Sequence, residues 1–255
     1  MRGTSAPAAG ARPNPVTLDR QRALSATGTT LALVVAATVV LALVLARVAG
    51  ADSTVAARAL VYSLLGGALV LALAARHLPG PRFGAANLVT LVRGALALLL
   101  AALIGSAPSA ALAWASVALS LIALALDGVD GALARKRGET SAFGARFDME
   151  TDALTILVLC ALVWQQGKAG VWVLIAGALR YLFVAAGFAL PWLKRALPPS
   201  RRRQAVCVAQ IASLIVCLLP FVTPPASTAV ALGGLAALLA SFAVDVAWLA
   251  RDARA

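Results

Sequence analysis

One short stretch of this chain, residues 126–153, has residue types and spacings that could do chemistry. Its sequence, LDGVDGALARKRGETSAFGARFDMETDA, holds six of the ten acidic residues in the 255-residue chain. Asp127 and Asp130 are three residues apart, and Asp148 and Asp152 are four apart, so each pair would share one face of a helix. Carboxylates gathered in a partly desolvated place repel one another unless a cation neutralises them. Because no His or Cys lies nearby, the oxygen ligands predict a hard ion such as Mg²⁺, Mn²⁺ or Ca²⁺.

Small and basic residues accompany the four aspartates. Gly131, Ala134 and Gly144 remove side-chain bulk from the same helix faces, which lets a flat or phosphorylated ligand approach the backbone. Arg135 and the basic loop after it add positive charge for such a ligand. The alternative is that charges here only mark the end of membrane-spanning helices. We accept that alternative for Glu139 and Glu150, but the aspartates form a helical ladder that interfacial charge alone does not explain.

The rest of the chain must hold this stretch in place, and it is strongly apolar. Hydrophobic residues make up 62% of the chain, which leaves too little polar surface for a soluble domain of this size. Runs rich in Ala, Leu and Val of about 20 residues predict membrane-spanning helices, because the strands of a β-barrel are about ten residues long and alternate in polarity. We expect eight such helices, at roughly residues 28–50, 57–75, 86–105, 110–127, 149–166, 171–193, 204–222 and 228–250.

The basic residues predict the orientation of these helices. With the N-terminus in the cytoplasm, nearly all Lys and Arg residues in the short loops fall on the cytoplasmic side, and only Arg58 and Lys168 fall outside. The acidic stretch is then expected at the cytoplasmic surface of the cell membrane. The net charge of +12 is explained by a basic face against anionic lipid, so no nucleic-acid partner is expected.

The chain is expected to divide into three parts. Residues 1–27 lack hydrophobic periodicity and are expected to form a disordered cytoplasmic tail. Residues 28–77 would form two extra N-terminal helices, since the linker RHLPGPRFGA that follows them is rich in Pro and Gly. Residues 83–251 would form the catalytic membrane domain of six helices. The three cysteines lie inside apolar runs at no metal-ligand spacing, which predicts packing residues.

The motif that carries the chemistry resembles a known family signature. Written out, it is D-x-x-D-G-x-x-A-R, eight residues, then G-x-x-x-D-x-x-x-D, which resembles the signature of the CDP-alcohol phosphatidyltransferases at every defined position. The six spans from 86 to 250 are similar to that family's six-helix core, and NLVTLVR, residues 87–93, is similar to its start. The matching residues are Asp127, Asp130, Gly131, Ala134, Arg135, Gly144, Asp148 and Asp152.

The resemblance implies transfer of a phosphatidyl group from a CDP-linked lipid, usually CDP-diacylglycerol, to the hydroxyl of a small polar alcohol, with release of CMP. It implies that the first three motif aspartates hold divalent metal, and that Asp152 is both a ligand and the base that deprotonates the acceptor. It also implies that Gly131, Ala134, Arg135 and Gly144 line the CDP site, and that the protein is a homodimer. We expect Mg²⁺ or Mn²⁺ as the cofactor, with two ions per site, because two ions about 4 Å apart can bind both the entering and the leaving oxygen.

Three arginines are candidates for phosphate contacts with the donor or the acceptor. Arg93 lies two turns into the third span and could reach the donor, or could extend its charge to the interface. Arg180 lies in the middle of the sixth span, where a charge needs a polar cavity or a structural partner. Arg201 opens the seventh span and could hold a phosphorylated acceptor, although basic residues there also fit the orientation signal.

Two other classes of function remain open. A cation transporter or channel could use the aspartates as its binding site, but transporter sites are usually near the bilayer midplane. A metal-dependent lipid phosphatase would use water in place of the alcohol. The alcohol itself is not identified by the motif, because different acceptors share the same donor site.

Overall fold

The computed structural model describes residues 15–50, 52, 54–77, 83–138 and 140–253. Within these ranges, the side chains of residues 15–24, 77, 130, 134 and 135 lie outside the described part. The described chain forms eight α-helices and two short 3₁₀ helices and contains no strand. They are α1 (Pro15–Val48), α2 (Thr54–His77), α3 (Ala85–Ala102), α4 (Ala110–Arg137), α5 (Ala142–Gln165), η1 (Val171–Val173), α6 (Leu174–Ala189), η2 (Pro191–Lys194), α7 (Arg201–Leu218) and α8 (Ala226–Asp252).

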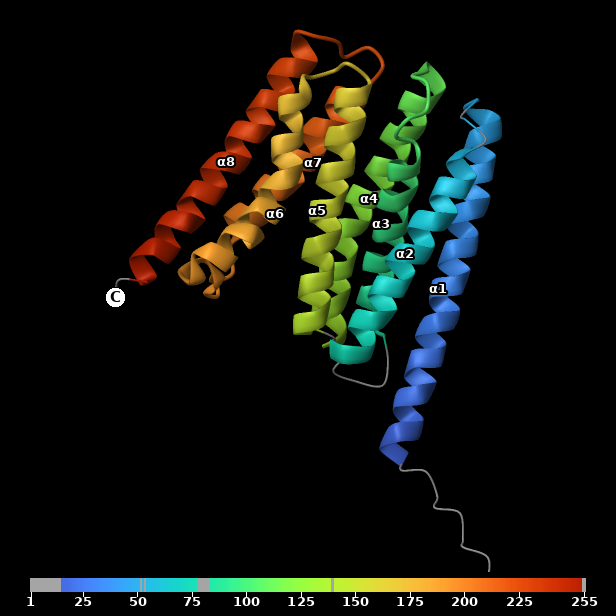
Figure 1. The fold of residues 1–255 in the computed structure, drawn as a ribbon, viewed down its shortest axis with the longest axis vertical. Helices are drawn as coiled ribbons and strands as arrows, with labels where there is room; N and C mark the ends of the chain where they lie inside the picture. Colours follow the sequence, from blue (N-terminus) through green and yellow to red (C-terminus); the bar gives the residue numbers. More distant parts are fainter. Residues whose placement is uncertain (1–14, 51, 53, 78–82, 139, 254–255) are drawn as a thin grey trace, which may run out of the picture.

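Successive helices run in opposite directions, so the chain is an antiparallel helical bundle (Figure 1). The first turns of α3, α5 and α7 and the last turns of α4, α6 and α8 lie at one end, which we call the motif end. The bundle divides at this end, because α6 and α8 lean away from α5 towards the C-terminus (Figure 1). The acidic motif spans the connection between α4 and α5, and it therefore lies at the motif end beside this division.

Helix α3 is at the centre of the packing, with contacts to α1, α2, α4 and α5. Leu99, Leu100 and Leu103 are fully buried at its C-terminal end, and Leu159 of α5 and Leu214 of α7 belong to the same core. Burying a leucine side chain contributes about 1.5–3 kcal/mol relative to leaving it exposed to water. Between helices in a bilayer this hydrophobic gain is absent, because lipid tails are as apolar as leucine, and close packing of side chains stabilises helix association instead.

Close approach of the helices depends on small residues at a few positions. A Cβ at Gly177 of α6 would lie 2.6 Å from the Cα of Leu157 on α5, so any side chain there would push the two helices apart. Such glycine contacts are common where membrane helices pack backbone to backbone. The Gly177 contact therefore fixes the first turn of α6 on the second half of α5, away from the motif end where the two helices separate.

The two N-terminal helices are joined to the remaining bundle by a polar network at the end opposite the motif. Arg58 of α2 donates hydrogen bonds to the carbonyl oxygen of Ile104 and, at 3.4 Å, to the hydroxyl of Ser106. Gln165, at the end of α5, donates to the carbonyl oxygen of Ser106 at 2.9 Å. The two terminal nitrogens of a cation that would be costly in lipid are thus hydrogen-bonded by the loop after α3, and the α1–α2 pair is fixed against α3.

The predicted helices are present, with different limits. Helix α1 begins at Pro15 rather than at residue 28, because Pro is well tolerated in the first turn and a polar segment can stay helical outside an apolar environment. Helix α4 continues to Arg137 and ends where Gly138 adopts a φ of 63°, a conformation that glycine accepts at little cost. The sixth predicted run begins with η1, continues as α6 and ends in η2, which starts at Pro191, so it is one α-helix between two 3₁₀ turns.

Six of the described helices are long and apolar enough to cross a membrane, which makes this an integral membrane protein. The two that are not among them, α5 and α7, begin with charged segments: α5 carries Asp148 and Asp152 in its first half, and α7 starts with three consecutive arginines. Both are nevertheless packed inside the bundle against each other. The charges that lower their apolar character are the ones closest to the motif end.

Candidate active site

Three of the four motif aspartates converge on one point. Asp127 comes from α4, and Asp148 and Asp152 come from α5. One carboxylate oxygen from each lies within 4.8 Å of the other two. At 1.5 Å per residue, the three are about 9–15 Å along their helices from the motif end. Asp130 belongs to α4, but its side chain is outside the described part.

The guanidinium of Arg93, on α3, lies among these carboxylates. Its Nη2 is 2.5 Å from Oδ1 of Asp127 and also forms an ion pair with Oδ1 of Asp152, while its Nη1 is 2.5 Å from Oδ1 of Asp148. Only 3% of the Arg93 side chain is exposed, whereas the exposed fractions of the three carboxylate side chains are 22% for Asp127, 42% for Asp148 and 20% for Asp152. Arg93 therefore meets the cluster from its inner side and does not extend to the membrane interface.

Helices α3 and α5 can approach closely at this level because of Gly144. A Cβ at Gly144 would lie 2.9 Å from Oδ1 of Asn87 on α3, so the motif glycine lets the first turn of α5 rest on that side chain. The amide of Gly144 also donates to the hydroxyl of Ser141 at 3.0 Å, which caps the N-terminus of α5. This local structure fixes the rotation of α5, and with it the direction in which Asp148 and Asp152 point.

The remaining motif residues follow Asp127 along α4. Gly131 lies one turn after Asp127 and therefore on the same helix face, and it is half-buried. Ala134 and Arg135 continue the helix, but their side chains lie outside the described part. The predicted nucleotide-contacting residues are thus arranged along one face of α4 and at the first turn of α5, on either side of the connection between the two helices.

Cys207 of α7 contacts the cluster, which the sequence reasoning did not anticipate. Its sulfur lies 3.6 Å from Oδ2 of Asp152, on the oxygen that does not pair with Arg93. The residue is half-buried, in contrast to the fully buried Cys160 and Cys217. Spacing alone carries no signal for this contact, because it depends on how α7 packs against α5.

Arg180 lies on a different side of α5. Its Nη2 is 2.6 Å from Oε1 of Glu150. Because each helical residue advances about 100°, Glu150 projects about 160° away from Asp148 and Asp152. The polar partner expected for an arginine inside the sixth span is therefore Glu150, and the pair bridges α5 and α6.

The arginines that open α7 differ in their surroundings. Arg202 donates to the carbonyl oxygen and the hydroxyl of Ser241 at 2.6 and 2.7 Å, and forms an ion pair with the buried Asp245 of α8. Arg203 approaches the same Asp245 oxygen at 3.2 Å and donates to the carbonyl oxygen of Pro198. Arg201 is exposed, whereas Arg202 and Arg203 are partly buried. Of the three, Arg201 is therefore the most accessible to a ligand.

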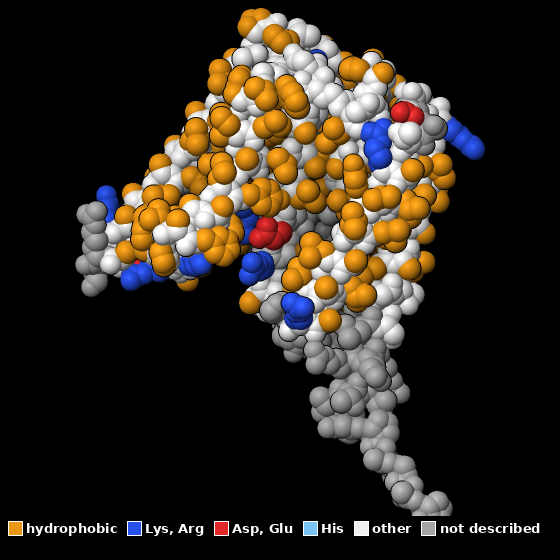
Figure 2. All heavy atoms as spheres, viewed as in Figure 1, with side chains coloured by type: hydrophobic (Ala, Val, Ile, Leu, Met, Phe, Trp, Pro, Cys, Tyr) orange, Lys and Arg blue, Asp and Glu red, His pale blue; other side chains and the backbone are white. Residues whose placement is uncertain are grey.

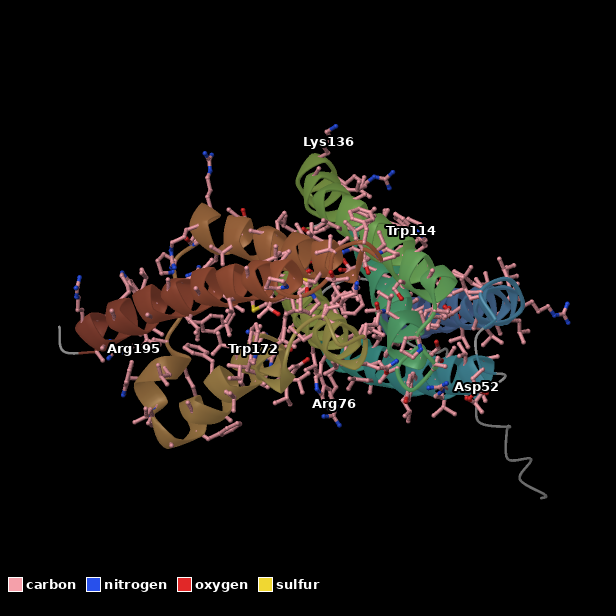
Figure 3. The ribbon with its side chains drawn as sticks, turned by 90° about the horizontal axis from the view of Figure 1, so that it is seen from above. Asp52, Arg76, Trp114, Lys136, Trp172 and Arg195 are labelled. Atoms are coloured by element: carbon pink, nitrogen blue, oxygen red, sulfur yellow. The ribbon has the colours of Figure 1, made fainter. Side chains whose placement is uncertain are left out.

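The surface of the molecule reflects this arrangement. Apolar side chains cover most of the face in Figure 2, while basic and acidic side chains gather around the hollow between the α6–α8 limb and the rest of the bundle. Seen from above, Lys136 on the last turn of α4 projects away from the bundle, and Arg195 lies at the edge formed by η2 and α8 (Figure 3). The motif end is thus rich in cations around an acidic centre.

The cluster is chemically suited to a hard divalent cation. It offers carboxylate oxygens from two helices at a separation that one ion can span, and each carboxylate keeps solvent exposure through which an ion can arrive. A cationic group, the guanidinium of Arg93, already lies within ion-pair distance of all three. The charge count supports the same conclusion, since three carboxylates exceed one guanidinium by two negative charges.

Comparison with known proteins agrees with this chemistry. Residues 83–246 match the family model of the CDP-alcohol phosphatidyltransferases, and this range contains Arg93, the motif and all of α4 to α7. No curated protein and no solved structure matches the chain significantly. Because the family match covers more than half of the chain and includes every residue of the carboxylate cluster, the chain belongs to the CDP-alcohol phosphatidyltransferase family.

Proposed function

We propose that this protein transfers a phosphatidyl group from CDP-diacylglycerol to the hydroxyl of a small polar alcohol. The observation that carries the proposal is the convergence of Asp127, Asp148 and Asp152 within 4.8 Å, from two helices, at one end of a membrane bundle of this family. In the reaction, the alcohol oxygen forms a bond to the phosphorus that carries the diacylglycerol. The bond from that phosphorus to the oxygen bridging the two phosphates breaks, and CMP leaves with that oxygen.

Asp127, Asp130, Asp148 and Asp152 would hold divalent cations, Mg²⁺ or Mn²⁺, with two ions per site. Such ions supply positive charge to the pyrophosphate and to the leaving phosphate oxygen. The convergence of carboxylates from α4 and α5 supports this assignment, because neither helix alone offers three oxygens around one point. The roles of the individual aspartates are inferred from the motif and from this geometry.

Asp152 would accept the proton of the attacking hydroxyl. Its two oxygens have different surroundings: Oδ1 pairs with Arg93, and Oδ2 contacts the thiol of Cys207. A thiol is a weak hydrogen-bond donor, so Oδ2 keeps more of its basicity than an oxygen bound to a guanidinium. This asymmetry favours Oδ2 as the proton acceptor.

The donor would lie along α4 and the first turn of α5. We assign its nucleotide to Gly131, Ala134, Arg135 and Gly144, and a donor phosphate contact to Arg93, which is next to the carboxylates. Gly144 would act mainly by allowing the close contact with Asn87. Arg201, with its exposed charge, stays the candidate for an acceptor phosphate, whereas Arg180 is paired with Glu150 on another face of α5.

The substrates also favour the location of the site. CDP and the alcohol are soluble in water and the acyl chains are not, so a site at the edge of the bilayer serves both. We propose that the protein lies in the cell membrane with its motif end on the cytoplasmic side, since the basic residues concentrate at that end. We further propose that residues 83–251 form the catalytic domain and that the protein acts as a homodimer.

The experiment that tests this function measures CMP release from CDP-diacylglycerol by purified protein in lipid nanodiscs. Mg²⁺ is present, and a panel of alcohols is added one at a time: serine, glycerol phosphate, inositol phosphate and choline. Release that depends on one alcohol supports the transferase. Release without any alcohol indicates hydrolysis, as in a lipid phosphatase, and the absence of release with every alcohol contradicts both. Asp127→Asn is the inactive control.

A further inference from the structure

We propose that Arg93 is a built-in competitor of the divalent metal, so that the cluster binds metal tightly only when the CDP donor is present. This inference rests on the proposed function, because it assumes that the three carboxylates hold metal. It adds that a residue of α3 sets the metal affinity, and that the donor's phosphates relieve the competition.

The competition arises because Arg93 engages one oxygen of each carboxylate that would hold the metal. Its two terminal nitrogens contact Oδ1 of each of the three converging carboxylates. A divalent cation held by the same cluster needs oxygens at about 2.0–2.6 Å. An oxygen already engaged by a guanidinium is a weaker ligand, and two cations sharing one set of oxygens repel each other strongly where little water screens them.

Burial makes the competition persistent. A surface arginine would exchange its partners for water at little cost, but Arg93 is only 3% exposed, and an isolated buried charge is costly. The guanidinium therefore gives up the carboxylates only if another anionic group replaces them. Among the molecules of the proposed reaction, the donor brings that group, because its pyrophosphate carries negative charge to the same place.

Charge balance indicates when the replacement takes place. The four motif aspartates carry four negative charges, which two divalent cations neutralise completely. A guanidinium left among them would then be in excess by one positive charge. The pyrophosphate of the donor brings two negative charges, which more than offset this excess, so metal and donor are expected to bind with positive coupling that depends on Arg93.

The simplest alternative is that Arg93 is a scaffold that holds the carboxylates together. The two roles predict opposite signs. If Arg93 competes, Arg93→Gln increases the affinity of the cluster for metal. If Arg93 only holds the cluster together, the carboxylates repel one another in the variant, and metal affinity decreases or stays the same.

The test measures Mn²⁺ binding to purified protein without lipid substrate, from the electron paramagnetic resonance signal of free Mn²⁺. Arg93→Gln is expected to lower the dissociation constant by a factor of roughly 5 to 150, the usual range for coupling between two linked ligands. Addition of CDP is expected to tighten Mn²⁺ binding in the wild type more than in Arg93→Gln. Arg195→Gln, which removes an exposed arginine that pairs with Asp252, is the matched control and should bind Mn²⁺ like the wild type.

An unchanged or weaker affinity in a folded Arg93→Gln protein would overturn the proposal. Folding is checked by thermal unfolding of each variant. Should Arg93→Gln not fold, Arg93→Met is used instead: its long unbranched side chain fills the buried position without a charge, so an increase in Mn²⁺ affinity is still expected, and its absence contradicts the proposal. The result is independent of turnover, so a protein that binds Mn²⁺ as expected but releases no CMP would refute the proposed function and leave the competition intact.

Discussion

The motif end contains two ion clusters of opposite composition. In one, a single guanidinium from α3, Arg93, lies among the carboxylates of Asp127, Asp148 and Asp152. In the other, a single carboxylate from α8, Asp245, lies between the guanidiniums of Arg202 and Arg203. Both connect residues that are far apart in the sequence, Arg93 with Asp148 and Arg202 with Asp245, and both include a buried residue.

The difference between the clusters is the sign of the excess charge. The Asp245 cluster has one positive charge in excess, and its arginines also donate to backbone carbonyl oxygens of Ser241 and Pro198. The Arg93 cluster has an excess of negative charge, in a protein whose net charge is +12. An excess of acid in such a basic molecule is expected to be balanced by a bound cation, whereas the Asp245 cluster is complete as a structural connection between α7 and α8.

The largest expected effect comes from removing a carboxylate of the Arg93 cluster. Asp152→Asn should lower the rate of CMP release by about 10²–10⁴-fold, the usual contribution of a general base, while keeping part of the Mn²⁺ affinity. Asp127→Asn should abolish turnover and also remove most of the Mn²⁺ affinity. Both are measured by CMP release and by Mn²⁺ titration of the same preparations. Equal loss of Mn²⁺ binding in the two variants would count against a separate proton-accepting role for Asp152.

Removing the carboxylate of the second cluster should lower the stability of the protein and leave its Mn²⁺ affinity nearly unchanged. Asp245→Asn leaves two guanidiniums without their carboxylate, and we expect a loss of stability of about 1 kcal/mol, the net contribution of a typical hydrogen bond, because both arginines are about a third exposed and keep access to water. The Mn²⁺ affinity should stay within about twofold of the wild type, a change of about 0.4 kcal/mol. Thermal unfolding in detergent and Mn²⁺ titration check the two statements. A strong loss of Mn²⁺ binding in a folded Asp245→Asn protein would mean that the two clusters are not separate.

The first of these clusters was largely predictable from the sequence, and the second was not. Spacings of three and four residues place Asp127 with Asp130, and Asp148 with Asp152, on helix faces, and the connection between the two helices is short enough to bring them together. Local periodicity suffices there because both helices are neighbours in the chain. Arg93 was a candidate for the site, but its position among all three carboxylates depends on α3 packing against α5.

The contacts that sequence reasoning missed all depend on helix packing between residues that are far apart in the sequence. Cys207 reaches Asp152 across 55 residues of sequence, and Asp245 meets Arg202 across 43. Glu150 was assigned to the interface only, yet it pairs with Arg180. Helix limits differed for a related reason: hydropathy follows the apolar environment, whereas α4 and α5 continue through charged residues until Gly138 and Ser141 end or cap them.

A third prediction concerns the pair between Glu150 and Arg180, which lies outside both clusters. Both side chains are partly exposed, so a double-mutant cycle with Glu150→Gln and Arg180→Gln should give a coupling of at most about 1 kcal/mol in thermal unfolding. Since Glu150 projects away from Asp152, Arg180→Gln should raise the KM for the alcohol by less than about threefold, or about 0.7 kcal/mol. A much larger increase in KM, with unchanged stability, would show that Arg180 contacts the acceptor.

The smallest expected effect comes from removing the thiol of Cys207, which distinguishes the role of Oδ2 of Asp152 from that of Oδ1. Cys207→Ala removes the thiol that helps to orient Oδ2 and leaves the ion pair of Oδ1 with Arg93. Because a less well oriented carboxylate accepts the proton less efficiently, we expect kcat to fall by about two- to fivefold with KM unchanged, the size of one modest hydrogen bond. Cys207→Ser keeps a donor and should recover part of the rate. Cys217→Ala is the matched control on the same helix: that thiol is buried and donates to the carbonyl oxygen of Ser227, so its loss should affect unfolding and not kcat. If Cys207→Ala and Cys217→Ala change kcat equally, the thiol beside Asp152 acts through the packing of α7, and the orientation of the carboxylate depends on Arg93 alone.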